Sequence, residues 1–184
     1  MSQTSFTKEK AAKAFESLKG DFGYTNVNAA PKLTKVVISV ATGSAMKRDR
    51  NRNKLVLNRL AKITGQMPSV TKAKKSVASF KLREGEEIGV RVTLRGKNMY
   101  AFLDKLFAVA LPRTKDFRGL NETGIDSMGN YTFGIKEHTI FPEIHDEELK
   151  DIFGMAVTLV TTAKDKKEAK AFLDLIEVPF KKNQ

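Results

Sequence analysis

The stretch TKAKKSVASFKLREGEEIGVRVTLRG, residues 71–96, divides into two halves of different character. In its second half, apolar residues at every second position from Ile88 to Leu94 alternate with glycine or polar residues. This alternation is typical of a strand with one buried face. The first half, residues 71–83, carries five Lys and Arg, no acid and no apolar periodicity. We therefore predict a solvated basic loop that leads into a half-buried strand.

The other face of this predicted strand presents Arg91, Thr93 and Arg95. Guanidinium and hydroxyl groups beside a basic loop suit a polyanion with a phosphate backbone. The same residues fit a solvated edge strand with a flexible hairpin loop equally well. At this point both interpretations stay open.

The composition limits the class of protein. A chain of 184 residues, 41% of them apolar, can bury one well-filled core, and we expect a single domain over residues 1–184. The chain has no Cys, which excludes a disulfide framework and a cysteine-based metal site or nucleophile. No signal peptide and no apolar run of about 20 residues is visible, so we expect a cytosolic protein.

The net charge of +12 is unevenly distributed along the chain. Residues 1–83 hold 18 Lys and Arg against 4 Asp and Glu, a balance of +14, whereas residues 84–184 hold 15 against 17, a balance of −2. This asymmetry predicts a nucleic-acid interface on one side of the molecule. A basic protein of the membrane surface is a rival interpretation, and it would need a strongly amphipathic basic helix with large apolar residues.

Hydrophobic periodicity predicts helices and strands that interleave along the chain. The expected helices cover residues 8–22, 47–64 and 97–110, and a last one is capped by Asp165 with Glu168 in a capping box. The expected strands cover residues 33–41, 67–71, 88–95, 130–135 and 153–162. We therefore predict an α+β fold, with a mainly antiparallel sheet, helices packed on one face and a long basic loop.

The expected helix over residues 47–64 is unusually basic. Its buried stripe would be Val56, Leu60 and Ile63, and seven bases crowd the remaining positions against the single acid Asp49: Lys47, Arg48, Arg50, Arg52, Lys54, Arg59 and Lys62. Like charges one turn apart repel, so a bound anion would make this helix easier to understand. The narrow apolar stripe lacks Trp and Phe, which disfavours membrane binding.

No set of residues indicates catalysis. His138 and His145 stand seven residues apart without a recognised metal-ligand spacing, and we interpret them as surface or loop histidines. No nucleophile is paired with a base in the sequence. We expect no metal, no cofactor and no enzymatic activity, and an enzyme that acts on RNA through a basic platform is the alternative.

Several longer motifs occur in a fixed order along the chain. They are Ile63–Gln66, Thr71–Ala78, Val92–Gly96, LPRTKDFRGL at 111–120, Gly129–Tyr131, GIKEHTIFPEI at 134–144 and Val160–Lys164. Together they resemble the bacterial family of large-subunit ribosomal protein five, and the likeness extends from the first helix to Phe180. The resemblance implies a non-catalytic component of the cytoplasmic ribosome. Its implied partners are 5S rRNA, 23S rRNA, P-site tRNA, small-subunit ribosomal protein thirteen and the neighbouring 5S-binding ribosomal proteins, with no membrane.

The resemblance also implies three groups of contact residues. The 5S rRNA-binding group would be Lys35, Ser39, Gln66, Thr71, Arg91, Thr93 and Arg95, where Ser39 stands in place of the family's Asn. The loop that contacts P-site tRNA would present Lys72, Lys74, Lys75, Ser76, Phe80, Lys81 and Arg83. The bridge to the small subunit would use Arg113, Asp116, Phe117, Arg118, Glu143 and Ile144.

Overall fold

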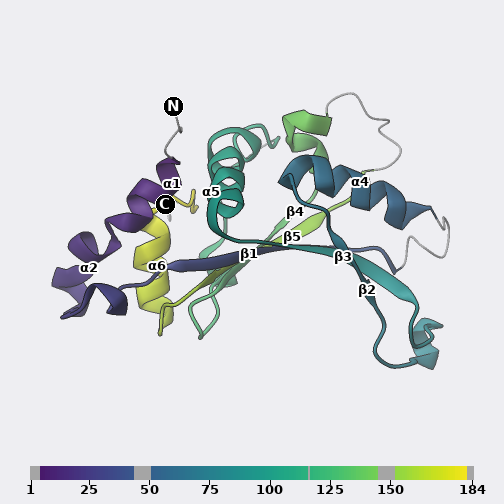
Figure 1. Cartoon of the computed structure of the whole chain (residues 1–184), viewed down its shortest axis with the longest axis horizontal. Helices are drawn as coiled ribbons and strands as arrows, with labels where there is room; N and C mark the ends of the chain where they lie inside the picture. Colours follow the sequence, from purple (N-terminus) through teal and green to yellow (C-terminus); the bar gives the residue numbers. More distant parts are fainter. Residues whose placement is uncertain (1–4, 44–50, 116, 145–151, 182–184) are drawn as a thin grey trace. The chain divides into compact units, whose positions relative to one another are not determined.

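The computed structural model describes residues 5–43, 51–115, 117–144 and 152–181 (Figure 1). The chain forms two compact units. Unit 1 comprises Met1–Val36, Leu94–Phe133 and Val157–Gln184, and unit 2 comprises Val37–Thr93 and Gly134–Ala156. The single domain expected from the sequence stays a prediction.

Five strands form one sheet in the order β2-β3-β1-β5-β4. They are β1 (Leu33–Ala41), β2 (Ser69–Lys72), β3 (Glu87–Leu94), β4 (Tyr131–Ile135) and β5 (Met155–Thr161). The strands β2 and β3 pair antiparallel, with a bulge between Thr71 and Lys72. All five strands lie at or within two residues of their predicted bounds, and the predicted α+β class with a mainly antiparallel sheet is confirmed.

The strands are half-buried, as their alternating sequences predict. Tyr131, Phe133 and Ile135 of β4 are buried, whereas the residues between them are exposed. In β5 every second residue is buried, and the residues between them are half-buried. This alternation leaves one face of the sheet open, which is the arrangement expected when helices cover the other face.

Unit 1 contains the helices α1 (Phe6–Ala12), α2 (Ala14–Phe22), α5 (Gly96–Lys105) and α6 (Lys166–Leu175), and the wider turn η3 (Leu106–Ala110) that continues α5. The prediction of one continuous helix over residues 8–22 is wrong, because a break at Lys13 separates α1 from α2. The ring of Phe22, the last residue of α2, is 36% exposed and stacks on Tyr24.

The start of α6 differs from the predicted capping box. Asp165 occupies the N-cap position but makes no side-chain capping hydrogen bond. The buried carboxylate of Glu168 instead accepts hydrogen bonds from the backbone N–H of Lys164, at 2.6 Å, and from the hydroxyl of Tyr24. Burial and this carboxylate together raise the pKa of Tyr24. Glu168 therefore joins α6 to Tyr24, which follows α2, and does not form the predicted capping box with Asp165.

Unit 2 contains α4 (Arg52–Thr64), which ends at Gly65 in the left-handed conformation with φ of 67°. Its predicted stripe of Val56, Leu60 and Ile63 is at most 1% exposed and packs against β2 and the short helix η6 (Pro142–Ile144). The predicted start of this helix at Lys47 lies outside the described residues.

Four more 3₁₀ turns are η1 (Val27–Ala29), η2 (Ala78–Phe80), η4 (Glu122–Gly124) and η5 (His138–Ile140). No helix in the described ranges is long and apolar enough to cross a membrane.

Candidate nucleic-acid interface

Within unit 2, one face of the sheet carries mostly polar side chains. On β1, Ser39 lies between the buried residues Ile38 and Val40 and faces away from them. On β3, Arg91 and Thr93 alternate with buried valines in the same way. The register places Ser69 opposite Arg91 and Thr71 opposite Gly89, and residues directly opposite share a face. We call this surface, formed by Ser39, Ser69, Thr71, Arg91 and Thr93, the open face.

Hydrogen bonds hold the edge of the open face in place. The hydroxyl of Ser69 donates to the carbonyl of Arg91 at 3.1 Å, and the side-chain amide of Gln66 donates to the carbonyl of Thr93 at 3.2 Å. A Cβ atom on Gly89 would lie 2.7 Å from the carbonyl oxygen of Val40 and 2.9 Å from Oγ1 of Thr71. Glycine at this position therefore allows the backbones to approach closely and the strands to form a smooth surface.

Five of the seven residues predicted to bind 5S rRNA belong to this part of unit 2. Ser39, Thr71, Arg91 and Thr93 lie on the open face, and Gln66 lies at its edge. The other two belong to unit 1. Lys35 is half-buried on β1, and Arg95 is exposed at the N-cap of α5. Most of the residues predicted to bind 5S rRNA are therefore brought together within unit 2 alone.

The segment between β2 and β3, residues 73–86, forms a structure that we call the arm (Figure 1). Val77 and Leu82 exchange two backbone hydrogen bonds of 3.0 and 3.2 Å, and the N–H of Ala73 donates to the carbonyl of Glu86 at 2.8 Å. The turn η2 closes the tip, and Lys81 ends it in the left-handed conformation with φ of 49°. The sequence predicted a solvated loop and did not predict this backbone pairing.

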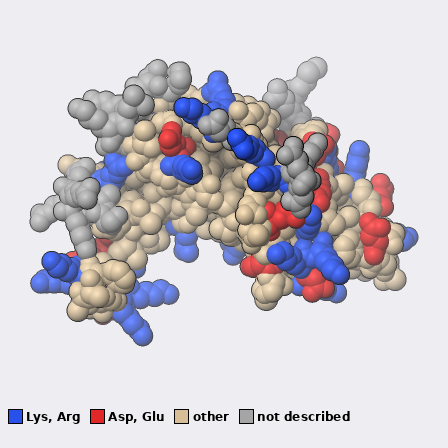
Figure 2. Space-filling model, turned by 180° about the vertical axis from the view of Figure 1, so that it is seen from behind, with Lys and Arg blue, Asp and Glu red and all other residues tan. Residues whose placement is uncertain are grey.

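The basic side chains of the arm are exposed. The exposed residues of the predicted tRNA-contacting set are Lys72 at the end of β2 and, on the arm, Lys74, Lys75, Ser76, Phe80, Lys81 and Arg83. Lys and Arg side chains project from the arm in several directions, at the lower left of Figure 2. The hydroxyl of Ser76 accepts a hydrogen bond from the N–H of Glu84 at 2.9 Å. Ser76 therefore braces the arm, whereas the cations remain open to a partner.

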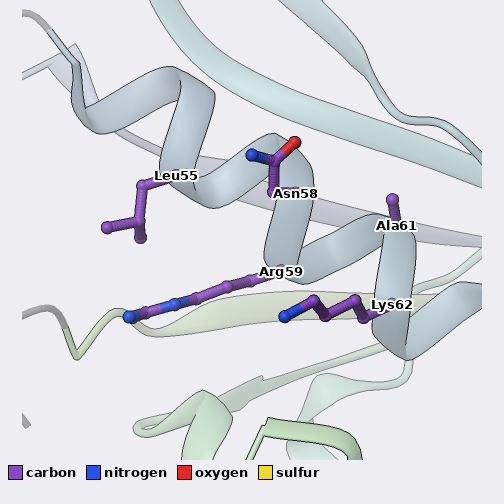
Figure 3. A pocket seen from close by; sticks show the side chains of 5 residues that line it. All are labelled: Leu55, Asn58, Arg59, Ala61 and Lys62. Atoms are coloured by element: carbon purple, nitrogen blue, oxygen red, sulfur yellow. The ribbon is translucent and has the colours of Figure 1, made fainter. Parts of the chain in front are cut away.

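A depression of about 620 Å³ lies along α4, lined by Leu55, Asn58, Arg59, Ala61 and Lys62 (Figure 3). The side chains of Arg59 and Lys62 project to the same side of the helix. Lys54 and Lys62 are exposed and Arg52 is half-buried, and α4 contains no acid. Lys47, Arg48 and Arg50, which the sequence places before this helix, lie outside the described residues. In the described part of α4, Lys54 and Lys62 supply the exposed positive charge, and the surface is less basic than the sequence predicted.

Two residues that the sequence placed at the surface are buried. Arg59 is 5% exposed and His138 is 1% exposed, and Nη1 of Arg59 lies 3.1 Å from Nε2 of His138. The ring of His138 stacks on Phe153 with centroids 4.0 Å apart, and its Nδ1 accepts a hydrogen bond from the N–H of Phe153. His138 lies in the connection between β4 and β5, as the loop interpretation expects, but the alternative that it is a surface residue is wrong. Position 59 completes the spacing of Val56, Leu60 and Ile63, so helical periodicity could have found Arg59.

A second buried polar group, also missed from the sequence, joins α4 to the sheet. Asn53 is 3% exposed, accepts a hydrogen bond from the hydroxyl of Thr42 at 2.5 Å and donates to Oε2 of Glu87 at 2.6 Å. Glu87 is thereby directed toward α4 and keeps its carboxylate off the open face. The open face consequently presents hydroxyl and guanidinium groups without a neighbouring acid from β3.

The residues predicted to bridge to the small subunit fall in both units. Arg113 and Arg118 are exposed and Phe117 is half-buried in unit 1, and Glu143 is exposed in unit 2. Ile144 is only 2% exposed, so it packs in the core of unit 2 and the prediction of a surface role for it is wrong. Asp116, His145 and the acidic residues after Ile144 lie outside the described residues.

Comparison with known proteins identifies the family. A model described as "Ribosomal protein L5" matches residues 26–83, and a model described as the C-terminus of the same ribosomal protein family matches residues 87–180. The chain belongs to the ribosomal protein L5 family. It is therefore a structural component of the large ribosomal subunit, and the expectation that it is not an enzyme is confirmed by the family.

Individual relatives match along nearly the whole chain. The large ribosomal subunit protein uL5 of Flavobacterium johnsoniae is 49% identical over 176 residues, which cover 96% of each chain. The protein of the same name from Mesoplasma florum is 49% identical over 180 residues, 98% of this chain and 97% of that protein. The one from Desulforamulus reducens is 49% identical over 166 residues, 90% and 91% of the two chains. The resemblance recognised from the motifs is thereby confirmed.

Proposed function

We propose that the chain binds 5S rRNA through the open face of unit 2. The observation that carries this proposal is the group of Arg91, Thr93, Thr71 and Ser39 on adjacent strands, displayed on one surface. A guanidinium can bind phosphate through two parallel hydrogen bonds, and hydroxyl groups can bind phosphate or sugar oxygens. These are the groups that recognise an RNA backbone and its 2′-hydroxyls.

The rigidity of the open face supports specific recognition. Its side chains project from paired strands, and Ser69 and Gln66 bond to the carbonyls of β3. A surface that is already ordered loses little conformational entropy on binding. The face also carries only one cation, Arg91, among its five residues. Its affinity would therefore depend on shape and hydrogen bonding more than on the number of released counterions.

The arm is proposed to contact P-site tRNA. Four exposed cations, Lys74, Lys75, Lys81 and Arg83, project from a hairpin that has few buried side chains. Each cation that neutralises a phosphate releases a counterion, so binding through the arm would weaken strongly as salt rises. The backbone pairs at Val77–Leu82 and Ala73–Glu86 restrict the arm before it binds. The entropy lost on ordering would therefore be smaller than for a free loop.

Two further contacts belong to the same proposal. The basic surface of α4, with Lys54 and Lys62 exposed, has the charge needed to dock a second RNA backbone, which in the large subunit would be 23S rRNA. Arg113, Arg118 and Glu143 are exposed and would contact small-subunit ribosomal protein thirteen. Charged rims of this kind mainly orient partners and raise association rates.

Binding titrations with 5S rRNA test the main proposal. We expect the full chain to prefer 5S rRNA over an unrelated RNA of equal length at physiological salt. Arg91→Ala combined with Thr93→Val should reduce that preference, whereas Lys166→Ala, which removes an exposed cation from α6 of unit 1, should leave it unchanged. Equal binding to both RNAs, or an equal loss from both variants, would exclude the open face as the specific 5S site.

A further inference from the structure

The tip of the arm presents an aromatic side chain to solvent. Phe80 is 70% exposed, more than any other Phe in the described ranges, and Val77 beside it is 37% exposed. A single exposed apolar residue is common on protein surfaces and needs no explanation. Phe80, however, lies next to an unusual backbone conformation and shares the arm with four exposed cations, and these two features together indicate a role.

The backbone holds Phe80 in one place. It is the last residue of η2, and the following residue, Lys81, has a φ of 49°. This left-handed conformation is unfavourable for a residue with a long side chain, and in the described ranges only Glu177 shares it among residues other than glycine. The N–H of Lys81 donates to the carbonyl of Ala78 at 2.9 Å, and the Val77–Leu82 pair closes the turn below it. Phe80 therefore belongs to a turn whose backbone is held by hydrogen bonds.

The surroundings of Phe80 favour a nucleic acid as its partner. The arm exposes four cations, Lys74, Lys75, Lys81 and Arg83, against two acids, Glu84 and Glu86, so its net charge is positive and suits an anionic partner. Proteins that bind single-stranded nucleic acid combine basic grooves with aromatic side chains on which bases stack. The arm has both elements, and its aromatic ring is placed at the outermost turn.

We propose that Phe80 stacks on an unpaired nucleobase of the RNA that the arm contacts. This inference rests on the proposed contact between the arm and tRNA and adds a component that does not depend on charge. The cations would bring the arm to the phosphate backbone, and the ring would bind a base whose face is accessible, as in the loops of a folded tRNA. Phosphate contacts are tolerant of sequence, and stacking would fix the position of the tip along the RNA.

A tryptophan at position 80 provides a direct test, because the chain contains no Trp. In Phe80→Trp the single indole reports on its own surroundings, and stacking on a base quenches its fluorescence. We expect quenching when the full chain is titrated with deacylated tRNA. We expect none with inorganic polyphosphate, which carries the charge but no bases. The matched control is Phe6→Trp in unit 1, since Phe6 is 53% exposed and has Nζ of Lys10 3.9 Å from its ring centroid.

Further substitutions at position 80 distinguish the effect of an aromatic ring from that of an apolar side chain of similar size. Phe80→Tyr should keep the affinity for tRNA, and Phe80→Leu and Phe80→Ala should both lower it about five- to tenfold, the low end of base–aromatic stacking. None of the three should change the slope of log affinity against log salt, because none removes a charge. Lys75→Ala should reduce that slope.

The outcomes distinguish the inference from the function on which it rests. If tRNA binds to the Phe80→Trp variant but the indole fluorescence is unchanged, stacking is excluded and the charge contact of the arm stands. If Phe80→Leu binds as well as Phe80→Tyr, the side chain makes an apolar contact instead of a stacking contact, and the inference is overturned. If the arm's cations can be removed without any effect on tRNA binding, both the proposed contact and the inference fail.

Discussion

The open face and the arm both belong to unit 2, and the two surfaces are built in different ways. On the open face the residues project from paired strands, and one Arg stands among hydroxyl groups. The arm carries four exposed cations and a Phe that is 70% exposed, and Ala73 at its base is buried. The comparison suggests that the face recognises RNA by shape and hydrogen bonds, whereas the arm attracts it by charge.

Charge along the sequence is a poor guide to this difference. The sequence suggested a basic half and a neutral half, but the basic residues are not confined to one unit. Unit 1 holds 18 Lys and Arg against 11 Asp and Glu, a balance of +7, and unit 2 holds 15 against 10, a balance of +5. Within unit 2, residues 37–93 carry 13 against 4, or +9, and residues 134–156 carry 2 against 6, or −4. The asymmetry therefore lies inside unit 2.

The largest effect is expected from a methyl group placed on the open face beside Thr71. In Gly89→Ala the new Cβ would meet the carbonyl of Val40 at 2.7 Å and Oγ1 of Thr71 at 2.9 Å, so β1, β2 and β3 must shift. We expect the free energy of unfolding to fall by about 1–3 kcal/mol, the usual cost of overpacking. Urea denaturation followed by circular dichroism measures this change.

The matched control is Gly134→Ala on β4. A Cβ atom at Gly134 would have no atom within 4 Å, so the loss of stability should be within about 0.5 kcal/mol, as for ordinary surface changes. Gly89→Ala should also weaken 5S rRNA binding, because its distortion lies beside Thr71 and Arg91 on the open face. Equal stability of the two alanine variants would show that the close approach at Gly89 is not needed.

The next largest effect concerns the charge of the arm. Replacing Lys74, Lys75 and Lys81 together by Ala should lower the slope of log affinity for tRNA against log salt by roughly two to three. The control removes three exposed cations from unit 1: Lys164, Lys166 and Lys167. A titration across a salt series would contradict our assignment if both triple variants gave the same slope.

A smaller effect is expected when Arg91 is replaced by Lys. The charge is kept, but the planar fork that binds phosphate through two hydrogen bonds is lost. We expect 5S rRNA affinity to fall by about 1 kcal/mol, roughly fivefold, with an unchanged salt slope. On the arm, Lys75→Arg should have little effect on either RNA, because the contribution of Lys75 itself depends on its charge, which Arg keeps. A loss of 5S affinity from Lys75→Arg as large as that from Arg91→Lys would remove the distinction between the two surfaces.

The sequence predicted the scaffold of the open face better than the polar contacts inside the core. The alternation from Ile88 to Leu94 depends only on neighbouring residues, and β3 begins one residue before it, at Glu87. The buried Arg59–His138 contact joins positions 79 residues apart, so helical periodicity can indicate that Arg59 faces the core but not that His138 is its partner. The break at Lys13 and the backbone pairing of the arm were also missed, because both depend on turn geometry more than on hydrophobic period.

Shortening the arm should have the smallest effect on folding. The residues Ala73 and Glu86 already share a backbone hydrogen bond of 2.8 Å between N–H and carbonyl, so an Asn-Gly turn can replace residues 74–85 and join them directly. This change retains Ala73, which is 6% exposed, and removes mainly exposed side chains. We expect the free energy of unfolding to change by less than about 0.5 kcal/mol, and the affinity for 5S rRNA to stay the same.

The shortened chain should lose the salt-dependent binding of tRNA, which a filter assay with both RNAs would measure. If 5S rRNA binding fell together with tRNA binding while the fold remained stable, the arm and the open face would form one continuous RNA site. The proposal that the two surfaces bind different RNAs would then be wrong.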